Sequence, residues 1–395
     1  VNAHELAHQW FGDLITAQSG KHHWLQEGFA TYYALLAEKE VFGDDYFYNE
    51  LYDYALQLRS AAKTDTIPVM NEKASSLSFY KKGAWALHTL REDIGAKNFQ
   101  KIVKKYLKKH QYKNVITDEF LAEVKKVVKT FDAENFKKTW LETSGFDMVL
   151  AESYLVKNKS VAAYIQLTKE KKDLENYKAI LESETYFPIK QYIFYKLANT
   201  PFEDKKELIE IGMKQNLYVR QAIAETVTKI PVEFKSQYET FLDDASYNTK
   251  EIALINLCKN FPEDKKNYLM KTKNIIGNND KSFRISWLSL DFLSDDDGYE
   301  KYLILQELLD FSSERYESSI RQNALEVLLK LAPDDYFVIA SLFRATTHHK
   351  WQFTKFLRDI IREKLKNSEF RNRVEELAKT ADEKTAALYM KFLKE

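Results

Sequence analysis

The chain has 395 residues, of which 45% are hydrophobic and 14% aromatic, so it is long enough for two or three domains with sizeable cores. Lys plus Arg and Asp plus Glu are equal at 59 each, so no overall field draws the protein to nucleic acid or anionic lipid. No apolar run approaches the roughly 18 residues that cross a bilayer. We therefore expect a soluble protein with no nucleic-acid partner and no membrane insertion.

Apolar residues recur at three- and four-residue spacing along most of the chain, and only ten glycines and six prolines interrupt them. This pattern predicts a mainly all-α protein with little sheet. The helices of the first part are expected near residues 1–16, 24–41, 44–60, 78–94, 97–109, 117–129 and 133–142. The segment SVAAYIQL at 160–167 is compatible with a short strand or a helix.

The first eight residues hold a motif with the chemistry of a zinc hydrolase. His4 and His8 are four apart, so on a helix they lie one turn above each other and can reach one metal ion. Glu5 follows the first histidine, and its carboxylate would face a water in the open position of the metal and act as general base. Because an HExxH string also arises by chance on charged helices, the motif needs a third ligand.

Glu27, in the segment WLQEGFA, supplies that third ligand. Eighteen residues separate it from His8, enough for the rest of the first helix, a turn through Ser19 and Gly20, and a second helix. Two histidines and a glutamate leave one position of a tetrahedral zinc ion for water, whose pKa falls to about 7. The sequence thus predicts one Zn²⁺ per chain, held by His4, His8 and Glu27.

These segments resemble the signature of the aminopeptidase N-like zinc metallopeptidases of the gluzincin group, usually HELAHQWFG followed by WLNEGFA. This chain reads HELAHQWFG at 4–12 and WLQEGFA at 24–30. FYKKGAWALHTLR at 79–91 resembles the family's YxKGA segment, and the resemblance implies that Tyr80 donates a hydrogen bond to the oxyanion of the tetrahedral intermediate. KTWLETSGFD at 138–147 is similar to the turn that closes the peptidase domain. The resemblance implies the helical lobe of a thermolysin-like zinc peptidase domain over residues 1–149.

The chain departs from the family pattern at three places. Gln26 replaces the asparagine before the glutamate ligand, and Ala34 replaces a glutamate seven residues after it, which removes a carboxylate expected near the metal. The strand whose glutamate holds the free amino group of the substrate in the family would precede Val1. We therefore expect a domain truncated at its N-terminal side, where any signal peptide would also lie. Aminopeptidase rather than endopeptidase action follows from the resemblance alone.

From residue 150 to residue 395 the sequence repeats itself, with segments such as VRQAIAETVTKIP and IRQNALEVLLKLAP that mostly end in proline. Intervals of 30, 30, 34 and 37 residues suit paired helices, and each proline forces a turn. We therefore expect a HEAT-like α-solenoid. Basic residues stand in register, and we expect them to pair with acids of the neighbouring repeat or with helix ends rather than to form a binding ladder. They are Lys190, Arg220, Lys250, Arg284 and Arg321.

The remaining histidines have simpler interpretations. His22 and His23 lie in the loop between the metal ligands and are expected at the rim of the site. His88 is expected in the core, and the adjacent His348 and His349 at the surface. The single cysteine, Cys258, excludes an intrachain disulfide and is expected to be a buried structural thiol.

Two classes of function remain. The favoured one is a zinc-dependent aminopeptidase that hydrolyses N-terminal residues from peptide substrates, with a zinc-activated water, Glu5 as general base and Tyr80 as oxyanion donor. The intact set of site residues favours this reading, because a decayed site is free to lose its base. The alternative is a catalytically degenerate helical-repeat interaction protein, favoured by Ala34. A related gluzincin endopeptidase or hydrolase is the third reading.

Overall fold

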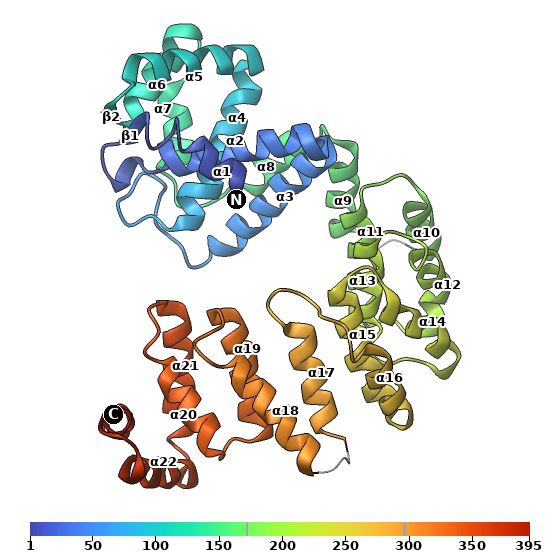
Figure 1. Ribbon diagram of the computed structural model, residues 1–395. Coiled ribbons are helices and arrows are strands. Elements are labelled where there is room, and N and C mark those ends of the chain that lie inside the picture. Colours follow the sequence, from blue (N-terminus) through green and yellow to red (C-terminus); the bar gives the residue numbers. More distant parts are fainter. Residues whose placement is uncertain (171–172, 295–297) are drawn as a thin grey trace. The chain divides into compact units, whose positions relative to one another are not determined.

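The computed structural model describes residues 1–170, 173–294 and 298–395. The described chain is mainly helical, as predicted, and its only sheet has two strands. Figure 1 follows the chain from its N-terminus in blue to its C-terminus in red. By packing, the chain divides into a first unit of Val1–Asn176 with Glu184–Ile189 and a second unit of Tyr177–Ser183 with Lys190–Glu395.

The first unit contains the elements at the blue and green end of Figure 1. Its helices match the predicted ranges from residue 24 onward, and segment 160–167 is helical. The elements are α1 (Asn2–Ala7), β1 (Ile15–Ala17), the 3₁₀ turn η1 (Gly20–His22), α2 (Trp24–Phe42), α3 (Asp44–Ala61), the π-helical turn η2 (Ser78–Lys82), α4 (Gly83–Ile94), α5 (Ala96–His110), β2 (Lys113–Val115), α6 (Thr117–Val127), α7 (Ala133–Phe136), the π-helical turn η3 (Lys137–Leu141), α8 (Met148–Leu155) and α9 (Lys159–Lys169).

The sequence predicted a first helix over residues 1–16, and this prediction is wrong for residues 8–16. The helix ends at Ala7, and the chain then turns back on itself into β1. Gly12 adopts a φ of 150°, and a Cβ there would come within 3.2 Å of the carbonyl oxygen of His8. This backbone conformation disfavours residues with a side chain. Glycine therefore lets the chain fold closely around His8.

Two glycines bring the second helix against the fourth. A Cβ on Gly28 of α2 would lie 3.0 Å from the backbone of Gly83 at the start of α4, so the two helices cross with nothing but backbone between them. The preceding turn η2 also packs against α2. The close approach carries Tyr80, in η2, to the helix that holds Glu27.

Segments far apart in sequence close the first unit. β1 and β2 pair in parallel, with Ile15 opposite Lys113 and Ala17 opposite Val115. The indole of Trp24 donates to the hydroxyl of Thr117 at 3.0 Å, and both residues are fully buried. The core of the first unit is rich in aromatic residues, and the ring of Phe29 stacks on those of Phe11, Trp24 and Tyr106.

The first unit extends beyond residue 149, the predicted limit of the catalytic region. Both α8 and α9 pack against α3. The side chains of Asn158 and Ser160 bond to the carboxylate of Asp45, at 2.7 and 3.0 Å. By packing, the main break in the chain thus follows Asn176. The domain boundary at residue 149, which the family resemblance implied, stays a prediction.

All secondary-structure elements in the described part of the second unit are helical. Its elements include α10 (Leu174–Glu182) and α11 (Phe187–Lys196), which begin in the first unit, and then α12 (Phe202–Gly212), α13 (Leu217–Thr226), the 3₁₀ turn η4 (Val232–Phe234), α14 (Lys235–Glu239), the 3₁₀ turn η5 (Thr240–Asp243), α15 (Tyr247–Asn260), the 3₁₀ turn η6 (Pro262–Asp264), α16 (Lys265–Thr272), α17 (Ser282–Phe292), α18 (Gly298–Phe311), α19 (Ser318–Leu331), α20 (Tyr336–Ala345), α21 (Trp351–Lys364), α22 (Ser368–Thr380) and α23 (Glu383–Leu393).

The basic residues in register occupy the third or fourth position of alternate helices, α11, α13, α15, α17 and α19. Arg220 bonds to Asp244 at 2.5 Å, and Arg284 forms two bonds with Glu307, at 2.8 and 2.7 Å. Arg321 donates to the carbonyl of Ser312, just past the end of α18. The prediction of acid and helix-end partners is confirmed for these three arginines.

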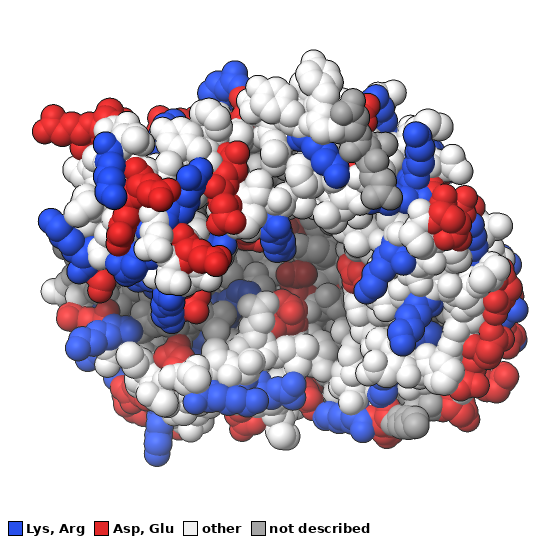
Figure 2. Space-filling model, turned by 90° about the horizontal axis from the view of Figure 1, so that it is seen from below, with Lys and Arg blue, Asp and Glu red and all other residues white. Residues whose placement is uncertain are grey.

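Charges of both signs are interspersed on the surface. On the face drawn in Figure 2, Lys and Arg side chains alternate with Asp and Glu, as expected from equal totals of 59. Across the described residues, no helix is both long and apolar enough to span a bilayer.

Candidate metal centre

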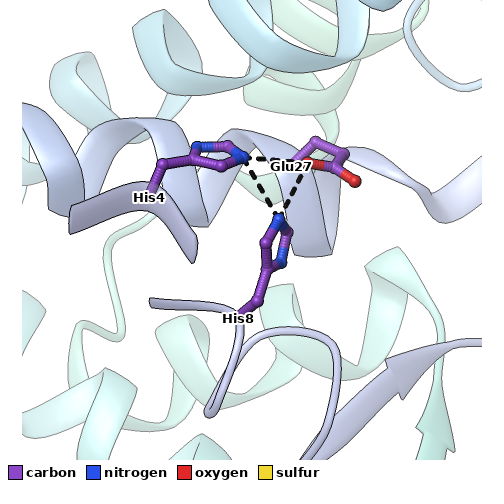
Figure 3. Close-up of side chains that lie close together, drawn as sticks. All are labelled: His4, His8 and Glu27. Atoms are coloured by element: carbon purple, nitrogen blue, oxygen red, sulfur yellow. Dashed lines mark hydrogen bonds and ion pairs between the residues drawn. The ribbon is translucent and has the colours of Figure 1, made fainter. Parts of the chain in front are cut away.

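Three predicted ligands converge at the start of the first unit. The Nε2 atoms of His4 and His8 are 3.1 Å apart, and Oε2 of Glu27 lies 3.3 Å from the first and 3.2 Å from the second. Figure 3 shows the three side chains pointing toward one point, the histidines from the N-terminal segment and the glutamate from α2. No other group of His, Cys, Asp or Glu in the described ranges meets the geometry of a metal site.

This donor set fits a zinc ion. Ligands about 2.0–2.2 Å from a tetrahedral zinc lie about 3.3–3.5 Å from one another, and the three observed separations are close to these values. Oε2 of Glu27 is buried, and within the described structure no hydrogen bond reaches it. Three electron-pair donors so close together repel one another unless a cation lies between them.

Hydrogen bonds beyond the donors orient the two imidazoles. Nδ1 of His8 donates to the carbonyl of Phe11 at 2.8 Å, which leaves the lone pair of Nε2 facing the donor cluster. Nδ1 of His4 lies 3.5 Å from Oγ1 of Thr31, one turn after Glu27 on α2. Burial and the neighbouring His8 lower the pKa of His4, which favours the neutral imidazole that binds metals.

Sequence reasoning missed Phe11 and Thr31. The carbonyl of Phe11 carries no side-chain signal, and the turn at Gly12 that follows it was not predicted. Thr31 could have been found from its spacing, because a residue four after Glu27 shares its face of the helix.

Tyr80 lies beside the donor cluster, and Glu5 opens on the same cavity. The ring of Tyr80 stacks on that of His4, with centroids 5.4 Å apart. His4, Glu5 and Tyr80 all line one cavity of about 470 Å³. Burial and the carboxylates of Glu27 and Glu5 raise the pKa of Tyr80, so the phenol stays protonated as a hydrogen-bond donor. The structure therefore brings the five predicted site residues to one place.

A buried lysine anchors the turn that carries Tyr80. Lys82 is 2% exposed, and its Nζ donates to the carbonyl of Thr143 and, at 2.6 Å, to that of Gly145. Burial lowers the pKa of Lys82 to about 8. Both carbonyls belong to the segment that was similar to the closing turn of the peptidase domain. Lys82 thus ties the tyrosine turn to that segment, a role that sequence reasoning missed.

The departures from the family pattern take defined positions. Oε1 of Gln26 accepts a bond from the backbone N–H of Ala17 at 3.1 Å, so the longer amide joins α2 to β1. Ala34 is 8% exposed and lines the same cavity as Tyr80. His22 is a structural residue, since its Nδ1 accepts from the backbone N–H of Thr117 at 3.2 Å.

The remaining predictions about single residues are confirmed. His23 lies at the edge of the site, 3.9 Å from Oε1 of Glu27. His88 is fully buried among aromatic rings, and burial lowers its pKa to about 4. Cys258 is buried, and burial raises its pKa to about 11, as expected for an unreactive thiol. His349 is exposed and His348 partly so.

Known proteins resemble the first part of the chain. Residues 1–140 match the Peptidase family M1 domain. Aminopeptidase M1-D of Oryza sativa subsp. japonica is 36% identical over 156 residues, which cover 37% of this chain and 18% of that protein. Endoplasmic reticulum aminopeptidase 2 of Homo sapiens is 37% identical over 128 residues, covering 30% of this chain and 13% of that protein.

A solved structure, an M1 zinc metallopeptidase from Deinococcus radiodurans, is 33% identical, with a TM-score of 0.33 and coverage of 36% of this chain and 32% of that one. The match spans less than a fifth of the length of the curated relatives named above. The residues that match the family model include the donor cluster and the turn that carries Tyr80. Residues 1–140 of this chain are accordingly similar in sequence to the Peptidase family M1 domain.

Proposed function

We propose that this protein is a zinc-dependent aminopeptidase that removes N-terminal residues from peptides. The observation that carries the proposal is the convergence of His4, His8 and Glu27 at one point, beside a cavity that Glu5 and Tyr80 line. The relatives named as aminopeptidases support the reaction class.

Each side chain has a role that follows from its chemistry and position. His4, His8 and Glu27 would hold one zinc ion, which supplies an acidified water and polarises a carbonyl when bound. Glu5 takes the proton of the attacking water and passes it to the leaving amine. The protonated Tyr80 donates a hydrogen bond to the oxygen of the scissile carbonyl as negative charge develops on it. Phe11 and Thr31 keep the imidazoles oriented.

Zinc content is the first measurement. The purified chain is expected to contain about one zinc per molecule by elemental analysis, and His8→Ala should lose it. His349→Ala, in the second unit, is the matched control and should retain the metal. A folded chain without zinc would contradict the proposal.

Blocking the amino terminus of the substrate distinguishes an aminopeptidase from an endopeptidase. An aminopeptidase cleaves peptides with a free amino terminus and leaves N-acetylated peptides intact, whereas an endopeptidase cleaves both. Release of amino acids from the free peptide alone supports the proposal. Cleavage of the acetylated peptide would establish endopeptidase action instead.

For residues 150–395, which include the whole second unit, we propose a HEAT-like array. Helices α13, α15, α17 and α19 each pack against the next, and this order follows the sequence repeats. The intact donor cluster argues against a degenerate metal site in a pure interaction protein, because such a protein gains nothing from keeping three donors converged.

A further inference from the structure

One arginine of the second unit lacks the carboxylate partner that its counterparts have. Arg284 forms two bonds with Glu307. Arg321, the fourth residue of α19, is only 4% exposed, and it donates through Nε to the carbonyl of Ser312. Neither Nη atom of Arg321 has an acceptor within the described structure, and both keep some solvent-accessible surface. A largely buried guanidinium therefore retains a fork of unused N–H donors.

A second cation lies at the start of the same helix. Lys350 directly precedes α21, and its Nζ donates to the hydroxyl of Ser318, the first residue of α19, at 3.1 Å. Ser318 and Arg321 are three residues apart, so they share a face of α19. No side chain caps this helix end, where the free backbone N–H groups add partial positive charge. Two cations thus meet at the positive end of a helix.

An imidazole supplies a further donor beside these cations. Nδ1 of His348 accepts the backbone N–H of Lys350 at 3.0 Å, so the proton of the neutral ring is on Nε2. The ring of Phe353 contacts both the imidazole of His348, with centres 5.3 Å apart, and the guanidinium carbon of Arg321, at 5.5 Å. Burial and the neighbouring cations, Arg321 and Lys350 among them, lower the pKa of His348. We refer to the four donor residues as the α19 cluster: Ser318, Arg321, His348 and Lys350.

The acids near the α19 cluster do not neutralise it. Burial lowers the pKa of Arg321, and Glu314 offsets part of this effect, whereas Arg344 near the end of α20 adds to it. Among the residues that the structure describes, no carboxylate forms an ion pair with Arg321, Arg344 or Lys350. Cations that gather without a counterion repel one another, and the repulsion is stronger where water is excluded. An anion bound among them would remove this cost.

We propose that the α19 cluster binds a phosphate group, carried by inorganic phosphate or by a phosphomonoester. A guanidinium with free Nη donors holds two phosphate oxygens at once, and the ammonium and imidazole donors reach the others. The uncapped N-terminus of α19 adds N–H groups and a dipole that favour the same anion. A carboxylate has two oxygens and one charge, so it would leave some of these donors unused. The proposal concerns the second unit alone and does not depend on peptidase activity.

Titration calorimetry of the full chain with inorganic phosphate, at low and constant chloride, tests the proposal. Arg321→Gln should weaken binding by about 10- to 100-fold, because charge-assisted hydrogen bonds to the anion are lost. The matched control is Arg284→Gln, which removes the same charge from the same part of a repeat. It should keep the affinity, because Glu307 already occupies that guanidinium.

A second variant keeps the test independent of folding. Arg321 also supports the fold through its bond to Ser312, whereas Lys350 is exposed. Lys350→Gln should leave the thermal unfolding temperature almost unchanged and weaken phosphate binding by about three- to fivefold. Loss of affinity in Lys350→Gln, with the control intact, supports the site even if Arg321→Gln does not fold.

Two further probes identify the ligand chemistry. O-phosphoserine carries the phosphate group as a monoester, and acetate offers a carboxylate. Similar affinities for phosphate and O-phosphoserine assign the phosphate group itself, and tighter binding of O-phosphoserine assigns the monoester as the source. Acetate that binds as tightly as phosphate overturns the proposal, as does a folded chain that binds neither phosphate compound. Phosphate binding that is lost in His8→Ala and retained in Lys350→Gln would place the anion at the metal centre and also overturn it.

Discussion

The two packing units hold their helices together in different ways. In the first unit, contacts join distant segments: β1 pairs with β2, and Trp24 bonds to Thr117. In the second unit, helices mostly contact near neighbours in the chain, such as α13 with α15 and α17 with α19. A polar atom in the first unit is thus fixed by several remote segments, and one in the second unit by adjoining helices.

The difference matters for chemistry. Of the described residues, those that could hold a metal lie in the first unit. Buried polar groups of the second unit, such as Asn256, are satisfied by neighbouring helices, here through the carbonyl of Ala224 and the hydroxyl of Tyr238. A reactive cluster needs donors held against mutual repulsion, which remote contacts achieve. We therefore expect substitutions in the first unit to alter the metal centre and those in the second unit to leave it intact.

The largest expected effect is that of Glu5→Gln. Removing the proposed general base should lower turnover by about 10²- to 10⁴-fold. Zinc should remain bound, because the base is not a ligand. Steady-state hydrolysis and elemental analysis on the same sample measure both. Glu307→Gln, which removes the partner of Arg284 in the second unit, should leave turnover unchanged. Equal losses of turnover in the two variants would contradict the expectation that only substitutions in the first unit alter the site.

Tyr80→Phe comes next. Loss of one oxyanion donor should lower kcat by about 10²- to 10³-fold. The control is Tyr238→Phe, which removes a buried hydroxyl that donates to the carbonyl of Ala224 at 2.8 Å. That change should cost about 1–2 kcal/mol of stability and leave kcat intact. Full turnover with weaker substrate affinity in Tyr80→Phe would point to a packing role for Tyr80.

Two buried lysines allow a comparison across pH. Burial lowers the pKa of Lys82 from 10.5 to about 8, so between these values the unfolded chain binds a proton that the folded chain has released. Stability contributed by this group therefore rises with pH across that window, by up to about 3 kcal/mol. Relative to Lys82→Met, the unaltered chain should gain stability from pH 8 to 10.5, as measured by denaturant unfolding. A flat difference would mean that Lys82 is not buried as described.

Lys205 is the counterpart of Lys82 in the second unit. It is 4% exposed, donates to the carbonyls of Leu197 and Ala198, and has a pKa lowered by burial. Lys205→Met should therefore change the pH dependence of stability in the same direction. Only Lys82→Met should also lower kcat, because only Lys82 anchors the turn of Tyr80. Equal kcat values in the two variants would remove Lys82 as a positioning residue.

The smallest expected effect compares two glycines. In Gly28→Ala the new methyl group meets the backbone of Gly83 at 3.0 Å, so α2 and α4 must separate, at a cost of about 1–3 kcal/mol. In Gly212→Ala it meets side chains, Phe194 and Ile223. Both variants should unfold at a lower temperature than the unaltered chain. Weaker zinc binding is expected in Gly28→Ala alone, because the proposed ligand Glu27 directly precedes Gly28, where α2 crosses α4.

The sequence predicted much of the site because its parts are local. Helical periodicity places His4 and His8 on one face, and the eighteen-residue interval leads to Glu27 on the next helix. The turn after Ala7 was not predicted, since the apolar pattern continues through residues that fold back around Gly12. The supporting contacts from Phe11, Thr31 and Lys82 involve backbone carbonyls or spatial neighbours, which periodicity does not report.

By itself, the sequence determined the helical period of the chain, the donor types and their spacing, the charge balance and the repeats of the second unit. All of these depend on neighbours within a few turns of helix. Only the tertiary structure decided that Gly28 meets Gly83, that Tyr80 stacks on His4, and that Lys82 bonds to the carbonyls of Thr143 and Gly145. These placements depend on which helix faces pack together, and packing is set by the shapes of many side chains at once.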